Sequence, residues 1–295
     1  MALIERFTGK RGEVGGLPIS RALPVVGRRA VGAWCFMDHA GPATLAPGQG
    51  MRVGPHPHTG LQTFSWMIEG EILHRDSLGS AQVLRAGQVN LMTAGRGICH
   101  SEESLTERLQ LAQLWIALPD SSRFGPPRFE HFATLPQLSL GGFAGTLLVG
   151  AHGGARSPVP SDTELLGMDL VCAAAAEAAL PLEPHFEWGL MALEGELTLQ
   201  LDDGETASLQ PGELLYLAPG QTRLQLRSAA AARLLLLGGP PFPEPLLLWW
   251  NFVGRSPDEI RRFAADWNAG QGFGEVRGYD GERLSAPEVP PLRAH

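Results

Sequence analysis

The chain has 295 residues, of which 44% are hydrophobic, and its formal net charge is -8 at pH 7. This length is enough for two ordinary domains or one large barrel, with a sizeable buried core. The acidic balance, without a run of Lys or Arg, disfavours electrostatic binding to nucleic acid or to an anionic membrane surface.

Glycine and proline are frequent, with 37 and 24 copies, which is typical of many short strands joined by tight turns. The expected fold class is therefore all-β. The three cysteines, Cys35, Cys99 and Cys172, form neither a disulfide framework nor a paired metal motif, which favours a reducing compartment. The first sixteen residues lack an apolar segment followed by a small-residue cleavage site, and the longest apolar runs are interrupted by charges such as Arg233. We therefore expect a cytoplasmic protein that does not span a membrane.

Short segments of alternating apolar and polar residues begin at Gln62 and are separated by Gly or polar turns. These segments predict antiparallel strands over 62–69, 71–76, 81–85, 88–94 and 109–118. The stretch 124–161 is rich in Gly and Pro and is expected to connect two halves, with one strand near 146–149.

The chain then repeats itself at an offset of 125 residues. Glu-Gly-Glu at 69–71 returns at 194–196, Gly87 corresponds to Gly212, and Gly95 corresponds to Gly220. Glycines at strand corners are constrained where φ is positive or backbones approach closely. The matched spacing therefore predicts two copies of one β-unit.

An amphipathic helix is predicted near the end of the chain. Ser256 suits the N-cap, Pro257 the first helical position, and Glu259 the position three after the cap. Gly270 closes the segment. The apolar positions follow helical spacing: Ile260, Phe263, Ala264 and Trp267.

Two pairs of polar residues carry the chemistry. His56 and His58 are two residues apart, and so are His100 and Glu102. Residues two apart in a strand point to the same face. Three imidazoles and one carboxylate suit a divalent first-row metal such as iron, copper, nickel or zinc. A single His-x-His pair is usually solvated or hydrogen-bonded, and the second pair is what favours a metal site.

The repeat offers an internal control on this hypothesis. At the offset of 125, the four candidate positions correspond to Pro181, Glu183, Gln225 and Arg227. The second copy thus keeps the glycine framework without the ligand set. His185 and Glu187 offer at most a slipped partial site, so we expect no second metal.

Three motifs together, HPHTGLQTFSWMIEGEILHRDSLGS, MTAGRGICHSEES and GRSPDEI, resemble the pirin family of the bicupins, densely over 27–118. The resemblance implies two antiparallel cupin-type β-barrels face to face. The N-terminal barrel (1–130) would bind metal, and the C-terminal barrel (131–295) would lack ligands and carry the helix. It also implies one mononuclear metal, Fe(II) first, with Ni(II), Mn(II), Co(II), Cu(II) and Zn(II) as alternatives. The ligands would be His56, His58, His100 and Glu102. Many relatives have Glu where this chain has Gln62.

The same resemblance implies a function. Several pirins are similar to flavonol 2,4-dioxygenases, which use O2 to open quercetin-type substrates. The 3-hydroxyl of the substrate would bind the metal, and Glu102 would act either as a general base or as a plain ligand. The alternative is a metal-dependent regulatory protein that binds a transcription factor or a metabolic enzyme. A third reading is a bicupin that binds a small molecule without turnover.

Other residues fit structural roles better. His74 fits a solvated strand histidine better than a cavity residue, and His39 fits a local hydrogen-bonding residue. Cys99 is expected to be packed rather than reactive. Three tryptophans suit an interdomain or helix-packing core rather than base stacking: Trp249, Trp250 and Trp267.

Overall fold

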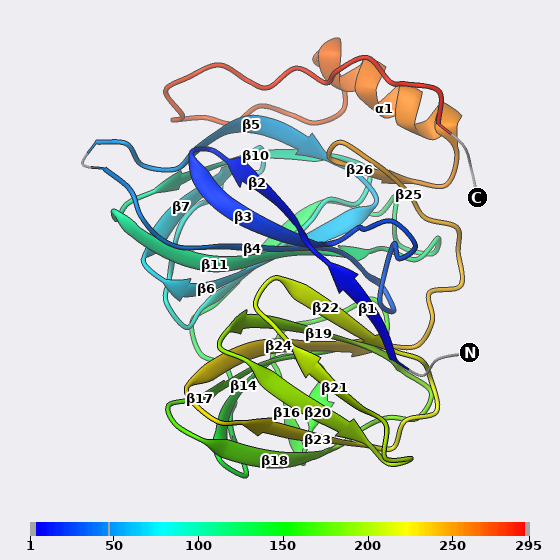
Figure 1. Ribbon diagram of the computed structural model, residues 1–295. Helices are drawn as coiled ribbons and strands as arrows, with labels where there is room; N and C mark the ends of the chain where they lie inside the picture. Colours follow the sequence, from blue (N-terminus) through cyan, green and yellow to red (C-terminus); the bar gives the residue numbers. More distant parts are fainter. Residues whose placement is uncertain (1–3, 47, 293–295) are drawn as a thin grey trace. The chain divides into compact units, whose positions relative to one another are not determined.

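The computed structural model describes residues 4–46 and 48–292, and these residues are mostly β-strand with one α-helix (Figure 1). The first three residues of the N-terminal stretch considered above lie outside the described residues. The all-β expectation is confirmed. No helix among the described residues is long and apolar enough to cross a membrane.

The chain divides into two compact units. The histidine unit comprises residues 12–19 and 40–133 together with the segment from residue 243 onward. The leucine unit comprises the segment up to residue 11 together with residues 20–39 and 134–242. This grouping differs from the expected consecutive halves, because the C-terminal helix belongs to the unit that contains residues 40–133.

The histidine unit is built on two antiparallel sheets. The seven-stranded sheet has the order β12-β9-β6-β11-β4-β3-β2, and the four-stranded sheet has the order β5-β10-β7-β8. Residues of β2, β3 and β4 fall in both units. The strand bounds are β2 (Lys10–Val14), β3 (Leu17–Leu23), β4 (Trp34–Thr44), β5 (Arg52–His58), β6 (Leu61–Glu69), β7 (Glu71–Asp76), β8 (Ala81–Arg85), β9 (Val89–Thr93), β10 (Ile98–Ser104), β11 (Arg108–Ala117) and β12 (Arg128–Phe132).

The leucine unit repeats this arrangement, with sheets β1-β22-β19-β24-β17-β14-β13 and β18-β23-β20-β21 and a small β15-β16 pair. The strand bounds are β1 (Ile4–Thr8), β13 (Gln137–Leu140), β14 (Phe143–Val149), β15 (Ala151–His152), β16 (Ala155–Arg156), β17 (Leu166–Cys172), β18 (Ala176–Pro181), β19 (Glu187–Glu194), β20 (Leu197–Leu201), β21 (Thr206–Leu209), β22 (Glu213–Leu217), β23 (Arg223–Ser228) and β24 (Ala232–Gly239). The strand orders of the two units correspond one to one over eight strands, so the predicted duplication is confirmed.

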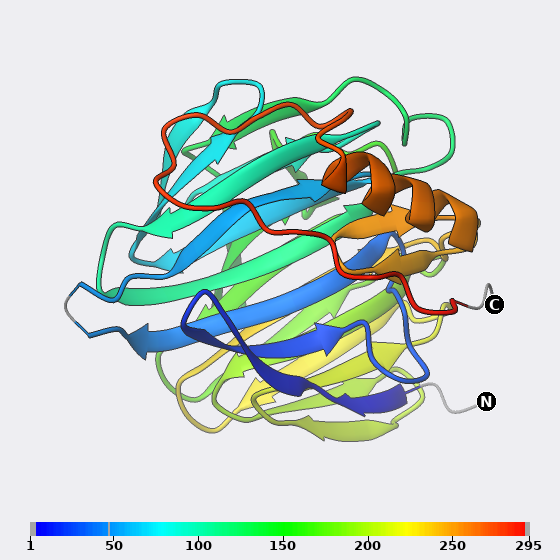
Figure 2. The same ribbon diagram turned by 90° about the horizontal axis from the view of Figure 1, so that it is seen from above.

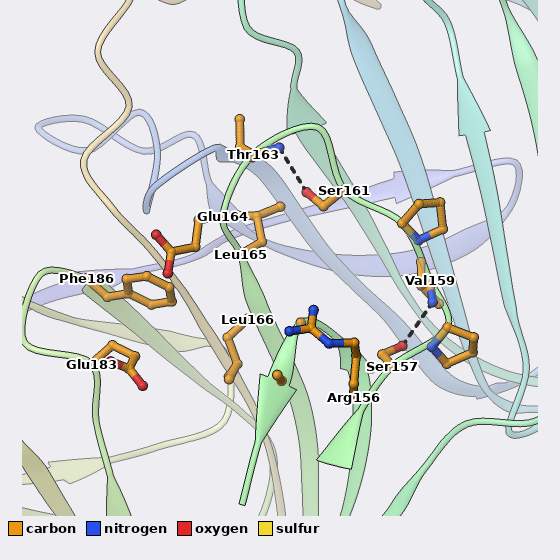
Figure 3. Close-up of a pocket in the computed structure, with 14 residues that line it drawn as sticks. Arg156, Ser157, Val159, Ser161, Thr163, Glu164, Leu165, Leu166, Glu183 and Phe186 are labelled. Atoms are coloured by element: carbon orange, nitrogen blue, oxygen red, sulfur yellow. Dashed lines mark hydrogen bonds between the residues drawn. The ribbon is translucent and has the colours of Figure 1, made fainter. Parts of the chain in front are cut away.

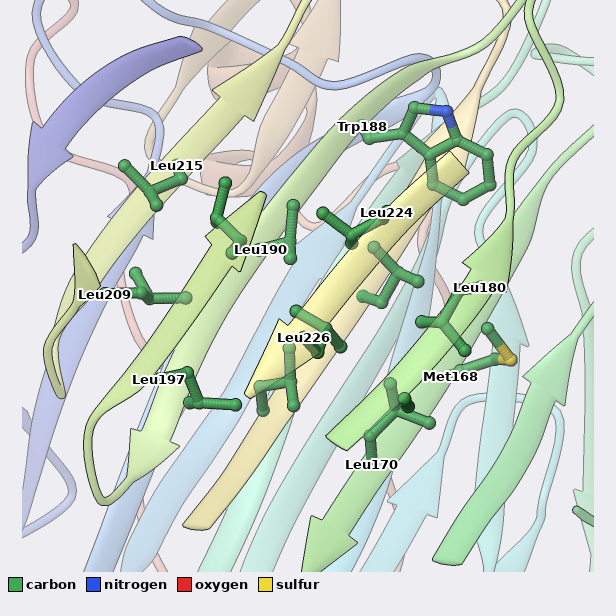
Figure 4. Close-up of a cluster of buried hydrophobic side chains, with 14 of the residues drawn as sticks. Met168, Leu170, Leu180, Trp188, Leu190, Leu197, Leu209, Leu215, Leu224 and Leu226 are labelled. Carbon is green, nitrogen blue, oxygen red and sulfur yellow. The ribbon is translucent and has the colours of Figure 1, made fainter. Parts of the chain in front are cut away.

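The two expected cupin-type units are confirmed, although their sheets do not close into barrels. In both units the strand pairing stops at the ends of two separate sheets, and apolar side chains join the sheets instead of hydrogen bonds. In the leucine unit, one buried cluster contains Leu190 of the larger sheet and both Leu197 and Leu226 of the smaller sheet (Figure 4). Each unit is therefore a β-sandwich of the cupin type.

The repeated glycines occupy equivalent strained corners. Gly70 has φ 89° and Gly195 has φ 68°. A Cβ atom at Gly70 would lie 2.2 Å from the carbonyl oxygen of Arg108, and one at Gly195 would lie 2.3 Å from that of Ala231. Both positions therefore exclude any side chain, which explains why these glycines recur.

The helix α1 spans Pro257–Asn268 and begins as predicted, with the side chain of Ser256 accepting a hydrogen bond from the backbone of Glu259 at 3.3 Å. Gly270, just past its end, has φ 72°. Its buried face packs with Phe252 on β26 (Phe252–Gly254), which pairs with β25 (Leu247–Trp249). Trp267 lies in this cluster and Trp249 and Trp250 pack against it, so the helix-packing alternative is confirmed.

The segment after α1 covers the edge of the four-stranded sheet. The backbone N–H of Leu284 donates to the carbonyl of Pro55 on β5 at 2.8 Å, and Trp267 Nε1 donates to the carbonyl of Leu284 at 2.7 Å. Figure 2 shows this segment, in red, running along β5. An edge strand that carries two candidate ligands is thus held by the C-terminal part of the chain.

Candidate metal centre

Three neighbouring strands of the histidine unit bring the candidate ligands together. Strand β10 lies between β5 and β7, so His100 faces His56 on one side and Glu102 pairs with His74 on the other. The β5 register shifts between His100 and Glu102. Since directly paired residues in an antiparallel sheet have neighbouring side chains, residues far apart in the sequence become adjacent.

Two overlapping groups of potential ligand atoms result. One atom from each of His56, His58 and His100 lies within 4.8 Å of the others, and the same is true of His74, His100 and Glu102. The ring centroids of His56 and His100 are 4.3 Å apart, and those of His58 and His100 are 5.0 Å apart. All five side chains are buried. The structure thus brings His56, His58 and His100 together, whereas Glu102 groups with His74 and His100; the role of the four predicted residues as ligands stays a prediction.

Backbone carbonyls fix the tautomers of the first two histidines. His56 Nδ1 lies 2.9 Å from the carbonyl oxygen of Gly54, and His58 Nδ1 lies 3.0 Å from that of Asn251. A carbonyl oxygen only accepts, so each Nδ1 carries the proton and each neutral ring keeps a lone pair on Nε2. Hydrogen-bonded Nδ1 with free Nε2 is the usual arrangement of metal-binding histidines.

Burial keeps the imidazoles uncharged. It lowers the pKa of His56 to about 4, against a smaller opposing effect of the Gly54 hydrogen bond. Burial also lowers the pKa values of His58 and His100 well below the ordinary value, and the neighbouring histidines add to the effect. Neutral imidazole is the form that binds a metal ion.

The carboxylate of Glu102 is buried without a hydrogen-bond donor among the described residues. Burial raises its pKa above the ordinary value, and the neighbouring His74 lowers it by less. A buried carboxylate is costly unless a cation accompanies it. Three converging imidazoles, with such a carboxylate beside His100, therefore fit a divalent metal ion, so the chemistry of the donor set passes the test for one.

The prediction that His74 is a solvated strand histidine is wrong. His74 is 2% exposed, its ring stacks on Phe129 at 4.4 Å, and its Nδ1 lies 3.3 Å from His100 Nδ1. Its Nε2 lies 3.2 Å from Asp76 Oδ2. The alternation of Ile72, His74 and Asp76 along β7 would have placed all three on the buried face, because Ile72 marks that face.

Three other residues singled out in the sequence, Cys99, Gln62 and His39, are all buried. Cys99 is buried and packs against the α1 cluster, and burial raises its pKa to about 11, so it is packed rather than reactive. Gln62 is buried and donates to Thr93 Oγ1 at 2.9 Å. His39 is buried in the leucine unit.

The offset of 125 was wrong for the leucine-unit positions that correspond to the candidate ligands. The strand registers show which residues occupy these positions. His100 pairs with His56, and the equivalent pair is Leu224 with Leu180, one residue earlier than the uniform offset places them. His74 pairs with Glu102, and the equivalent pair is Leu199 with Leu226. The shift at His100 and Glu102 arises because one residue fewer follows Gly220 than follows Gly95. The shift at His56 arises because the connection from β18 to β19 is one residue longer, by register, than the connection from β5 to β6. By the same register, Leu182 stands where His58 does.

Buried leucines thus replace all five polar side chains in the second copy, which has an apolar interior (Figure 4). The partial site considered at His185 and Glu187 does not form. His185 contacts Glu164 on the surface, whereas Glu187 accepts a hydrogen bond from Tyr216 at 2.8 Å.

The leucine unit also carries an open cavity of about 390 Å³ (Figure 3). Its lining includes Arg156, Glu164, Glu183 and Phe186. Neither group of potential metal ligands found among the described residues lies there. The cavity therefore adds nothing to the metal chemistry.

Comparisons with known proteins agree with this geometry. The family model described as Pirin matches residues 16–116, and the model described as Pirin C-terminal cupin domain matches residues 167–274. The chain is 51% identical over 292 residues to "Putative quercetin 2,3-dioxygenase PA1205" of Pseudomonas aeruginosa, covering 98% of this chain and 91% of that protein. It is 38% identical to a "Pirin-like protein" of Caulobacter vibrioides, covering 90% of this chain and 93% of that protein.

Solved structures show the same similarity. A crystal structure titled as quercetin 2,3-dioxygenase from Acinetobacter baumannii superposes with a TM-score of 0.93 at 45% identity, covering 99% of this chain and 98% of that one. The bacterial pirin YhhW from Escherichia coli, in complex with nickel(II), superposes with a TM-score of 0.62 at 20% identity, covering 81% of this chain and 99% of that one. The second similarity supports the fold alone.

Proposed function

The chain belongs to the pirin family, and we propose that it is a metal-dependent dioxygenase that opens the ring of flavonols of the quercetin type. The observation that supports this most is the buried convergence of His56, His58 and His100, with Glu102 beside His100. The names of the relatives from Pseudomonas and Acinetobacter support the substrate class.

In this proposal His56, His58 and His100 bind one divalent metal ion through Nε2, and Glu102 binds it through a carboxylate oxygen. We assign Fe(II) first, with Ni(II), Mn(II), Co(II), Cu(II) and Zn(II) as alternatives that the donor set also accommodates. Three neutral ligands and one carboxylate leave a charge of about +1, so the bound ion would polarise an anionic oxygen donor such as a flavonolate and provide a site for O2.

The residues of this chain would perform two tasks. Glu102, whose pKa is raised by burial, would accept the proton of the flavonol 3-hydroxyl at its carboxylate oxygen. The ring of Trp115 packs edge-on against His58 at 5.1 Å and, with the buried strands around it, would exclude water from the reacting groups. If Glu102 is only a ligand, solvent or the substrate's own ionisation must supply the deprotonation.

The test is O2 consumption by Fe(II)-loaded protein in the presence of quercetin, with CO measured in the same vessel. We expect one CO for each O2 consumed, and we expect His56→Ala to lose metal and turnover together. His185→Ala, an exposed histidine of the leucine unit, is the matched control and should keep both.

Stoichiometric metal binding without O2 uptake across a panel of flavonols and metals would contradict the dioxygenase proposal. That result would favour the regulatory alternative, in which a transcription factor or metabolic enzyme binds the metal-loaded protein. We also propose a cytoplasmic location, which the three buried free cysteines support.

A further inference from the structure

A buried chain of polar contacts ends at the candidate metal position. It begins at the carboxylate of Asp76, whose Oδ2 lies 3.2 Å from His74 Nε2. It continues from His74 Nδ1 to His100 Nδ1 at 3.3 Å. It ends at His100 Nε2, which lies 3.1 Å from His58 Nε2. Unlike His56 and His58, His100 thus has a second imidazole, and not a carbonyl, on its Nδ1 side.

The carboxylate of Asp76 determines which group donates and which accepts in each contact of this series. Its Oδ1 accepts hydrogen bonds from the backbone N–H groups of Leu78 at 2.9 Å and Ser80 at 3.0 Å, which fixes Oδ2 toward His74. A carboxylate only accepts, so His74 Nε2 must donate. A neutral His74 then has its lone pair on Nδ1 and accepts the Nδ1 proton of His100. His100 is left with its lone pair on Nε2.

We propose that Asp76 and His74 are positioning residues that hold His100 in the tautomer whose Nε2 can bind a metal ion. The inference rests on the proposed function for the identity of the metal site, although the tautomer itself is a property of the metal-free protein. Asp76 and His74 thereby do for His100 what the carbonyls of Gly54 and Asn251 do for His56 and His58.

The packing around His74 supports a positioning role. Its ring stacks on Phe129 with an interplanar angle of 15°, and both His74 and Asp76 are almost fully buried. The ring plane is therefore fixed from the side, and the hydrogen bonds fix its rotation in that plane. Two buried polar side chains are costly unless both are hydrogen-bonded, as they are here.

One substitution is expected to reverse the donor–acceptor direction of the hydrogen bonds between residue 76, His74 and His100 without removing a side chain. In Asp76→Asn the amide oxygen is expected to keep the Leu78 and Ser80 contacts, which turns the NH2 group toward His74 Nε2. His74 must then carry its proton on Nδ1, and His100 must carry its proton on Nε2. The variant should thus convert the metal-binding nitrogen of His100 into a donor.

Two substitutions at His74 distinguish the role of its hydrogen bond to His100 from the role of its packing against Phe129. His74→Asn offers an amide oxygen near the position of Nδ1 and should preserve the tautomer of His100. His74→Phe keeps the stacking on Phe129 and removes the acceptor. Asp169→Asn controls for the loss of a buried carboxylate, because Asp169 pairs with Arg233 at 3.0 Å in the leucine unit.

Two measurements test the proposal. Long-range 1H–15N correlation spectra of the metal-free protein, labelled at histidine, report which ring nitrogen carries the proton. Competition with a chromophoric chelator for Co(II) reports the metal affinity. Thermal unfolding of every variant checks that it is folded.

We expect His100 protonated on Nδ1 in the wild type and in His74→Asn, and protonated on Nε2 in Asp76→Asn. Asp76→Asn and His74→Phe should bind Co(II) about 10–100-fold more weakly, and Asp169→Asn should bind normally. A doubly protonated His74, or an unchanged His100 tautomer with unchanged affinity in Asp76→Asn, would overturn the proposal. If His74→Asn loses affinity with the His100 tautomer intact, His74 is itself a ligand and the proposal is wrong. Failure of the wild type to bind any metal would instead contradict the proposed function, and the spectra would still decide the tautomers.

Discussion

The buried histidines of this protein have different neighbours, and these neighbours decide which ring nitrogen carries the proton and whether other potential metal ligands lie close by. His56 and His58 have carbonyl partners that assign a proton to Nδ1, whereas His39, in the leucine unit, is buried without belonging to either group of potential metal ligands among the described residues. The alternation of residues along a strand predicted that His56 and His58 lie together. It could not reveal the carbonyl of Asn251, which comes from a segment 193 residues away.

His39 gives a prediction about pH that is separate from metal binding. Burial lowers its pKa from 6.5 to about 4; Glu194 opposes this effect and Arg233 adds to it. Because the unfolded chain takes up this proton first, stability is full above about pH 6.5 and is lost as pH falls toward 4. A difference of about 2.5 in pKa corresponds to about 3 kcal/mol. The free energy of unfolding of metal-free protein, measured by urea between pH 7 and pH 4.5, should therefore fall less in His39→Gln than in the wild type.

The exposed His185 supplies the comparison for this experiment, since it sits beside Glu164 at the surface. His185→Gln should show nearly the wild-type pH dependence. Equal slopes for His39→Gln and the wild type would refute the assignment of an uncharged His39.

At the scale of elements, regular alternation predicted structure well and irregular segments did not. The predicted segments 71–76 and 81–85 coincide with β7 and β8, and α1 begins at the predicted cap. The stretch 124–161 was expected to hold one strand, but it contains β12 to β16. These strands are short, partly exposed and separated by Gly or Pro, so their hydrophobic pattern is too weak to identify. Their position is fixed by pairing with neighbouring strands, such as β12 with β9.

The contact between β5 and the C-terminal segment gives the second prediction. A Cβ atom at Gly54 would lie 2.6 Å from the carbonyl oxygen of Glu282. Gly54→Ala should push this segment from the strand that carries His56 and His58, with a destabilisation of about 1–3 kcal/mol. We expect weaker Co(II) binding in the same chelator competition.

Gly12→Ala is the matched control, because a Cβ atom at Gly12 would make only an ordinary contact of 3.6 Å with Ile19. This variant should match the wild type in stability and metal affinity. Normal affinity in Gly54→Ala would show that the C-terminal segment does not support the ligand strand.

At the scale of the whole molecule, one fold is used twice with different interiors. The glycine spacing in the sequence was enough to predict the duplication. The uniform offset nevertheless misplaced the second set of positions by one residue, because it assumed equal loop lengths after Gly95 and Gly220 and equal connections from β5 to β6 and from β18 to β19. Only the strand registers show that Leu180, Leu224 and Leu226 stand where His56, His100 and Glu102 do. The resemblance likewise predicted cupin-type units, but only the strand pairing shows that each unit consists of two separate sheets.

Because the interior of the leucine unit is apolar, we expect one potential metal ligand introduced there to destabilise the protein without creating a second metal site. Leu226→Glu would bury a carboxylate without a partner, which should destabilise the protein by about 3–5 kcal/mol at neutral pH. Leu226→Gln, of similar shape and without charge, should cost less. Metal analysis of folded Leu226→Glu protein should still give one metal per chain, and a second bound metal would contradict this account of the interior.

The most direct test of the central claim is an anomalous difference map, measured at the iron edge, from a crystal of protein loaded with Fe(II) under anaerobic conditions. We expect one peak per chain, at about 2.1 Å from Nε2 of His56, His58 and His100 and from an oxygen of Glu102. A peak at the Nδ1 side of His74 and His100, a peak in the leucine unit, or no peak at all would contradict the claim.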